Sequence, residues 1–202
     1  MKNLIYISIS FLLLTISASA QNDSTVIADN SFPLPILTIE PAIGMEASDM
    51  GDFIVSNLIQ WNIKKRFSIV SYTSYSYNTL LRDFNFIKTD YNYSLSQKFG
   101  IGTSLYTKHS SHTFSFLAGI RYVAFKETLQ NPDFETVSVS VSSLDPDVGL
   151  MYNLKIGKKK YFFSFRTYIP LYPYPFKSTD VWTLDGNMAN LSFEFGLGIR
   201  LK

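Results

Sequence analysis

The sequence predicts an all-β fold, a closed antiparallel up-and-down barrel that crosses a membrane, and three observations lead to it. Apolar and polar residues alternate along most of the chain, as in a strand with one dry and one polar face. Aromatic residues make up 16% of the 202 residues, with 13 Tyr and 17 Phe, which is typical of a surface with an apolar middle and polar margins. After the N-terminal segment, no apolar run is long enough for a membrane helix.

The first twenty residues have the features of a secretory signal peptide. Lys2 gives a short positive start, residues 4–16 are apolar, and Ser17–Ala20 provides small residues typical of a cleavage site. The apolar run is shorter than the roughly 20 residues of a transmembrane helix, although an uncleaved anchor is the alternative. We therefore expect a cleaved signal peptide at 1–20, a flexible periplasmic lead-in at 21–33 and a barrel at 34–202.

The composition excludes several classes of function. The formal net charge is only +2, and no basic stripe is interleaved with aromatic residues, so we expect no nucleic-acid partner. Cysteine is absent, which removes disulfides, thiolate metal sites and cysteine nucleophiles. The sequence implies no cofactor and no metal.

The clearest strand is the last one. Its apolar face carries Leu191, Phe193, Phe195, Leu197, Ile199 and Leu201, and its other face carries Ser192, Glu194, Gly196, Gly198 and Arg200. In a membrane barrel the apolar face contacts lipid and the polar face fills the lumen. A soluble periplasmic sandwich or ligand-binding barrel is the alternative, but tyrosines repeated on the apolar face favour a headgroup boundary.

Ten such segments are expected. They lie at about 35–45, 53–63, 67–77, 86–97, 99–107, 113–126, 135–143, 148–156, 160–171 and 190–201. Short turns are expected at 64–66, 97–98 and 157–159, and longer links near 46–52, 78–85 and 172–189. An even number of strands returns both termini to the same side. Eight is the alternative count, because 135–143 could be a loop hairpin.

These features resemble the small outer-membrane β-barrel superfamily of Gram-negative bacteria. The signal peptide, the alternating strands and the ending Phe193–Lys202 carry the resemblance. It implies residence in the cell outer membrane, contact with outer-membrane lipid and lipopolysaccharide, and insertion by the barrel-assembly machinery. Members typically end on an aromatic residue that this machinery reads, whereas this chain ends in Lys202. The superfamily includes adhesins, pores, structural barrels and lipid-modifying enzymes.

Charged residues at inward positions predict a network inside the barrel. The candidates are Glu40, Lys88, Asp90, Arg121, Lys155, Arg166, Glu194 and Arg200. Because buried charges need partners and a barrel of this size is nearly filled by side chains, we expect ion pairs that plug the lumen. The alternative is a narrow pore for small solutes.

Two further motifs are candidates for function. His109-x-Ser111 resembles the His-x-Ser pair of outer-membrane lipid A deacylases, although the flanking pattern of that family is missing. This resemblance implies an acyl hydrolase with His109 as base, Ser111 as nucleophile and Glu127 as orienting acid. The alternatives are a solvated turn and weak metal capture by His109 and His112.

The second motif is an aromatic segment near the last long link. Its residues are Tyr172, Tyr174, Phe176 and Trp182, and the first three alternate with prolines. A stiff aromatic loop suits recognition of an extracellular ligand, and the alternative is an interfacial girdle. Together these features predict a non-enzymatic outer-membrane barrel with a structural or surface-interaction role.

Overall fold

The computed structural model describes residues 37–46, 52–63, 66–77, 83–84, 87–129, 136–157, 159–172 and 191–201. Regular structure in these residues is β-strand throughout. No helix in this described part is long and apolar enough to cross a membrane. The expected signal peptide 1–20 and lead-in 21–33 lie outside the described residues.

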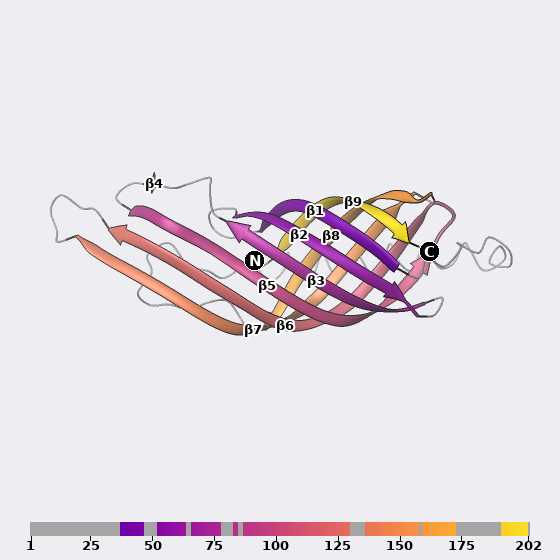
Figure 1. The fold of residues 1–202 in the computed structure, drawn as a ribbon, viewed down its shortest axis with the longest axis horizontal. Coiled ribbons are helices and arrows are strands. Elements are labelled where there is room, and N and C mark those ends of the chain that lie inside the picture. Colours follow the sequence, from indigo (N-terminus) through magenta and orange to yellow (C-terminus); the bar gives the residue numbers. More distant parts are fainter. Residues whose placement is uncertain are drawn as a thin grey trace, which may run out of the picture. The chain divides into compact units, whose positions relative to one another are not determined.

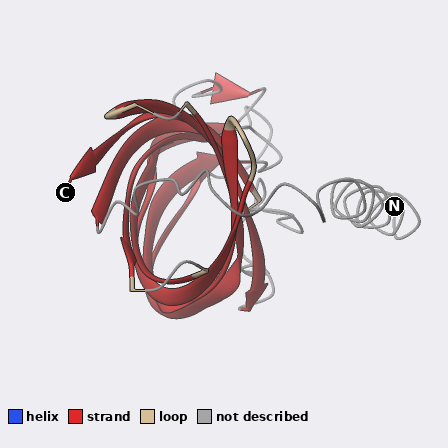
Figure 2. Cartoon of the chain, turned by 90° about the vertical axis from the view of Figure 1, so that its right-hand side faces the viewer, coloured by secondary structure: helices blue, strands red, loops and turns tan. Residues whose placement is uncertain are grey.

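Antiparallel pairing joins the strands into one sheet that closes on itself. The strands are β1 (Leu37–Glu46), β2 (Asp52–Asn62), β3 (Phe67–Tyr77), β4 (Asp83–Phe84), β5 (Ile87–Tyr106), β6 (Ser110–Leu129), β7 (Val137–Ile156), β8 (Tyr161–Tyr172) and β9 (Ser192–Leu201). Their order is β3-β2-β1-β9-β8-β7-β6-β5-β4, and the pairing of β3 with β5 closes a ring (Figure 2). The two-residue β4 lies outside this ring and pairs with β5. The closed wall therefore has eight strands, so the expected count of ten is wrong and the alternative of eight is confirmed.

Two expected strand breaks lie inside continuous strands. The expected segments 86–97 and 99–107 both overlap the 20-residue β5, and the dipeptide expected as a turn, Gln97-Lys98, lies near its middle. Segments 135–143 and 148–156 are likewise parts of β7, so 135–143 is not a separate hairpin.

Charge and proline account for these errors. Lys98 is charged but faces the lumen, where it pairs with Asp147. Pro146 lies in β7 just before Val148, the first residue at which the described part of β8 pairs with β7. A proline is tolerated at such a strand edge, where one side of the ladder is not used.

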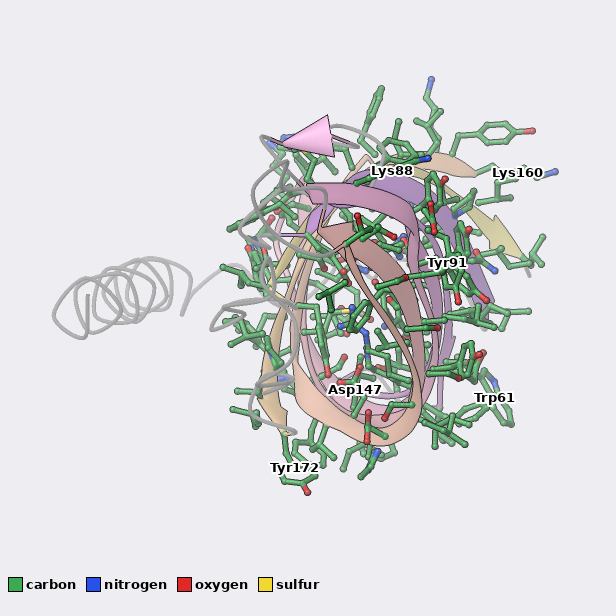
Figure 3. The ribbon with its side chains drawn as sticks, turned by 90° about the vertical axis from the view of Figure 1, so that its left-hand side faces the viewer. Trp61, Lys88, Tyr91, Asp147, Lys160 and Tyr172 are labelled. Carbon is green, nitrogen blue, oxygen red and sulfur yellow. The ribbon has the colours of Figure 1, made fainter. Side chains whose placement is uncertain are left out.

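Side chains alternate between the two faces of the wall. In β9, Glu194 is buried inside the barrel, whereas the neighbouring Phe195 is 64% exposed on the outside. Figure 3 shows the same division, with Asp147 inside the ring and Trp61 and Tyr172 outside it. The charged groups are thus buried and the large apolar groups exposed, which reverses the arrangement of a water-soluble domain.

The strand connections distinguish the two ends of the barrel. The short connections after β2, β5 and β7 lie at the end where β1 begins and β9 ends, which we call the turn end. Gly157 begins the last of these turns with a φ of 117°, a conformation that glycine adopts without steric cost. The connections after β1, β3, β6 and β8 leave from the opposite end, which we call the loop end.

Three neighbouring strands are longer than the rest. β5, β6 and β7 have 20 residues each, whereas the other wall strands have 10 to 12. Figure 1 shows them running past the ends of the other strands. Beyond the last β3–β5 pair, Tyr77 with Tyr93, their pairing continues to Ile87 on β5 and Leu129 on β6. We call residues 87–92, 125–129 and 137–141 the three-stranded extension.

Candidate functional site

The lumen contains four ion pairs whose side chains are almost wholly buried. They are Arg166–Glu194, Lys155–Glu40, Lys98–Asp147 and Arg121–Glu46, with N···O distances of 2.7, 2.5, 2.7 and 3.1 Å. A buried charge is strongly destabilising unless it is paired and hydrogen-bonded. Each of these four cations faces an anion, so the set is neutral as a whole.

The middle of the lumen is organised around Glu194. Its carboxylate accepts hydrogen bonds from Arg166 Nε at 2.7 Å, the Tyr72 hydroxyl at 2.6 Å and the Ser192 hydroxyl at 2.9 Å. Ser56 donates to the same carboxylate. Both carboxylate oxygens are therefore engaged by protein donors.

Towards the turn end, Lys155 holds a second polar layer. Its ammonium group contacts Glu40 at 2.5 Å and donates to Gln60 Oε1 at 2.7 Å and Thr38 Oγ1 at 3.1 Å. Asn153 donates to the other oxygen of Glu40 at 2.8 Å. The three donor positions of the lysine are thus used by protein groups, whereas the buried Asn153 Oδ1 has no hydrogen-bond partner in this layer.

Towards the loop end, Lys98 and Asp147 meet across β6. Gly119 is the register partner of both residues, and it has no side chain to separate them. The ammonium group of Lys98 also lies 4.0 Å from the ring centroid of Tyr168, whose hydroxyl donates to Asp147. Lys98 also donates to Ser96 Oγ at 3.0 Å and lies 5.3 Å from the Tyr72 ring centroid, so one ion pair, two cation–π contacts and two hydrogen bonds hold this layer.

Three contacts cross the full width of the lumen. Each joins strands that lie four places apart around the eight-stranded ring. They are the hydrogen bond from Lys155 on β7 to Gln60 on β2, the stack of Tyr72 on β3 with Tyr168 on β8, and the ion pair of Arg121 on β6 with Glu46 on β1. Between these crossings the lumen is packed with the buried side chains of Leu58, Val70, Leu117 and Met151.

The structure brings together five of the eight lumen residues expected from the sequence. Glu40, Arg121, Lys155, Arg166 and Glu194 form the ion pairs described above.

The other three expected lumen residues do not join these ion pairs. Arg200 is half-buried at the turn end, where it donates to the carbonyl of Gly157 at 2.7 Å. Lys88 and Asp90 lie on the three-stranded extension, where Lys88 is exposed and Asp90 pairs with Lys126 at 3.0 Å. The extension continues beyond the closed wall, where no lumen is enclosed. Alternation of side chains in this part therefore does not show that a residue faces the lumen.

Sequence reasoning missed three members of the network. Lys98 was expected in a turn, Glu46 in a loop, and Asp147 in a gap between strands. The spacing of two residues from Ser94 through Ser96 to Lys98, all buried, is the signal that extends the inward face across the expected turn.

The residues of the expected acyl-hydrolase motif are not brought together. His109 is exposed in the turn after β5, whereas Ser111 is buried on the lumen side of β6. Glu127 lies near the opposite end of β6, separated from Ser111 by sixteen residues of strand at about 3.3 Å each. Among the described residues, no cluster of three or more His, Cys, Asp or Glu suits a metal ion.

The other histidine has a defined environment on the outer wall. His112 Nδ1 lies 2.8 Å from the Tyr152 hydroxyl, and its Nε2 lies 3.2 Å from the Ser110 hydroxyl. A histidine bonded to a tyrosine at the turn end of the wall matches the polar margin of an apolar surface rather than a catalytic pair.

Aromatic side chains gather at the loop end of the outer wall. Tyr93 lies 6.1 to 6.3 Å, between ring centroids, from Tyr75, Tyr91 and Tyr122. Of the expected aromatic segment, Tyr172 ends β8 and is 57% exposed. Tyr174, Phe176 and Trp182 lie outside the described residues.

No protein-family model and no curated protein matches the sequence. The barrel is similar to the crystal structure of Neisserial surface protein A, with a TM-score of 0.53 and 9% sequence identity over 82% of this chain and 96% of that chain. It also matches the N-terminal β-barrel domain of Pseudomonas aeruginosa OprF, with a TM-score of 0.42 and 11% identity over 80% of this chain and 96% of that chain. A third match is Ail, the attachment invasion locus protein of Yersinia pestis, in complex with the heparin analogue sucrose octasulfate, with a TM-score of 0.40 and 11% identity over 82% and 96% of the two chains. The likeness to the first shows the fold: this chain shares the closed antiparallel barrel of Neisserial surface protein A, here with eight strands in the wall.

Proposed function

We propose that this chain is a non-enzymatic outer-membrane barrel with a closed lumen, which presents a three-stranded sheet outside the membrane for structural or surface interactions. The observation that carries the proposal is the inverted distribution of side chains. Phe99, Phe163 and Phe195 are 60 to 68% exposed on the outer wall, whereas Arg166 and Glu194 have no exposed surface inside. Such a wall is stable only against an apolar solvent, and a lipid bilayer provides one.

Strand length supports insertion with the extension outside the bilayer. A tilted strand needs about 9–11 residues to cross the hydrocarbon core. The strands of 10 to 12 residues meet this length, whereas β5, β6 and β7 exceed it with 20 residues each. The surplus lies at the loop end, so the extension stands in the aqueous or lipopolysaccharide layer. Insertion of such a barrel would use the barrel-assembly machinery.

The three contacts that cross the lumen support a closed barrel rather than a pore. A solute moving along the axis would have to displace the Lys155–Gln60 bond, the Tyr72–Tyr168 stack and the Arg121–Glu46 pair in turn. Each contact lies at a different depth, so opening one of them does not open the lumen.

Reconstitution of the purified protein in planar lipid bilayers tests the closed lumen. We expect no stable single-channel steps from protein that is folded on gels. Stable steps that require the folded protein would contradict closure and support the narrow pore.

A shortened variant tests the surface role. Residues 126–140 are replaced by Asn-Gly, which joins β6 to β7 at the register pair next to Phe125 and Val141. We expect the barrel to fold as before, while attachment of whole cells to mucin-coated wells falls. Equal attachment by cells with the full and the shortened chain would contradict the surface-interaction role and leave the structural one.

A further inference from the structure

The charges at the turn end are of one sign. Arg66, Lys108, Lys159 and Lys160 are exposed there, and Arg200 is half-buried between them. The described residues of this end include no exposed Asp or Glu. We call the four exposed cations the basic ring.

The loop end differs in its charges. Cations and anions are mixed there: Arg121 and Lys126 pair with Glu46 and Asp90, Lys88 is exposed, and Asp145 is half-buried. Among the described residues, exposed cations without any exposed acidic residue are therefore found at the turn end.

The basic ring borders the exposed apolar wall directly. Arg66 precedes Phe67, which is 41% exposed, and Lys160 precedes Tyr161, which is 66% exposed. The ammonium group of Lys160 lies 6.0 Å from the centroid of the Tyr161 ring. A cation next to an interfacial ring, at the margin of a lipid-facing surface, lies at the depth of lipid phosphates.

We propose that the basic ring binds the headgroups of anionic phospholipids in the leaflet around the turn end. The proposal rests on the proposed function, because it requires the wall to be embedded in a bilayer. Basic residues close to a membrane surface attract anionic lipids, and no exposed acidic group in the described part of this end opposes them, since Glu40 is buried and paired with Lys155.

The partner is a glycerophospholipid rather than lipopolysaccharide because of the end on which the ring lies. The start of β1, the end of β9 and the three short connections after β2, β5 and β7 belong to the turn end, which in the proposed orientation faces the periplasm. Lipopolysaccharide would meet the loop end and its extension instead. The ring would thus anchor the barrel in the inner leaflet and resist tilting.

Trp61 provides a probe beside the ring. It is 50% exposed on the outer wall near the turn end of β2, five residues before Arg66 (Figure 3). The only other tryptophan is Trp182, so the full chain with Trp182→Phe carries one fluorophore. In vesicles of phosphatidylcholine and phosphatidylglycerol, one lipid or the other is brominated, and the quenching of Trp61 reports which lipid contacts it.

We expect brominated phosphatidylglycerol to occupy the surroundings of Trp61 at least about threefold more strongly than brominated phosphatidylcholine. The ratio should approach one in R66Q/K108Q/K159Q/K160Q and in high salt. The matched control K88Q/K126Q neutralises cations of the extension and should keep the ratio of the parent.

The outcomes separate the two proposals. Equal quenching by both brominated lipids in the parent would overturn lipid selectivity while leaving the membrane barrel intact. A ratio that survives neutralisation of the basic ring would also overturn the inference, because other groups would then cause the preference. Quenching by neither lipid, from protein that is folded on gels, would contradict the lipid-facing wall and with it the proposed function.

Discussion

Arg166 and Glu194 are register partners on β8 and β9, 2.7 Å apart, and neither side chain has any exposed surface. Their pair lies at the centre of the lumen, where Tyr72 and Ser56 complete the hydrogen bonding of the carboxylate. The pair therefore joins neighbouring strands and also connects them to β2 and β3.

Replacement of Arg166 by methionine should be strongly destabilising. It leaves the buried Glu194 without its cation, and the loss of one partner of a buried pair typically costs about 3–5 kcal/mol. The free energy of unfolding, measured by urea titration of protein folded in lipid, should fall by about that amount.

A second variant separates charge from packing in this pair. Arg166→Met with Glu194→Gln removes both charges, so it should be less destabilised than Arg166→Met alone. Lys88→Met, on the exposed extension, is the control and should change stability by less than about 0.5 kcal/mol. A double variant no more stable than the single one would show that the charge is not the cause.

Gly149 should be required for the stack that crosses the lumen. A Cβ at this position would collide with the Tyr168 hydroxyl and lie 2.5 Å from the backbone oxygen of Ile169. Gly149→Ala should displace the Tyr168 ring from Tyr72 and lower stability by about 1–3 kcal/mol. The temperature at which the folded gel band disappears measures the effect, and an unchanged temperature would contradict the packing described for this layer.

Lipid A should carry the same number of acyl chains with and without this protein. The reason is geometric, because Ser111 is buried inside the wall while His109 is exposed in the turn. Mass spectra of lipid A from a deletion strain and its complemented parent provide the measurement. A difference of one acyl chain that is lost in Ser111→Ala would support the hydrolase instead.

The two ends should differ in their accessibility on cells. An epitope inserted after Pro132, between β6 and β7, belongs to the loop end and should be labelled by antibody on intact cells. An epitope inserted after Lys159 belongs to the turn end and should be labelled only after the outer membrane is permeabilised. The opposite pattern would reverse the proposed orientation.

The alternation of side chains could be predicted from sequence wherever a strand has both faces in contrasting surroundings. In β9 each expected outward residue from Phe193 to Leu201 is exposed by 36% or more. The inward position of Glu40 and Arg166 could be predicted for the same reason, because both lie in short, regular strands.

The strand count could not be predicted from the sequence, because in a barrel a charged residue or a proline can lie either in a turn or inside a strand. The charge of Lys98 favours a turn, but Asp147 pairs with it in the lumen, so the lysine is stable inside a strand. A proline such as Pro146 favours the end of a strand, but here it lies in β7 just before the pairing with the described part of β8 begins, where a proline is tolerated. Partners from strands four places apart, such as Tyr72 and Tyr168, depend on closure of the sheet and have no local signal.

Fractionation of expressing cells, followed by gels of boiled and unboiled outer-membrane samples, tests whether the chain is a barrel embedded in the outer membrane. The protein should be recovered in the outer membrane, and its band should migrate differently until it is heated, as a closed barrel does. Recovery in the soluble periplasm, with the same migration before and after heating, would contradict a membrane-embedded barrel.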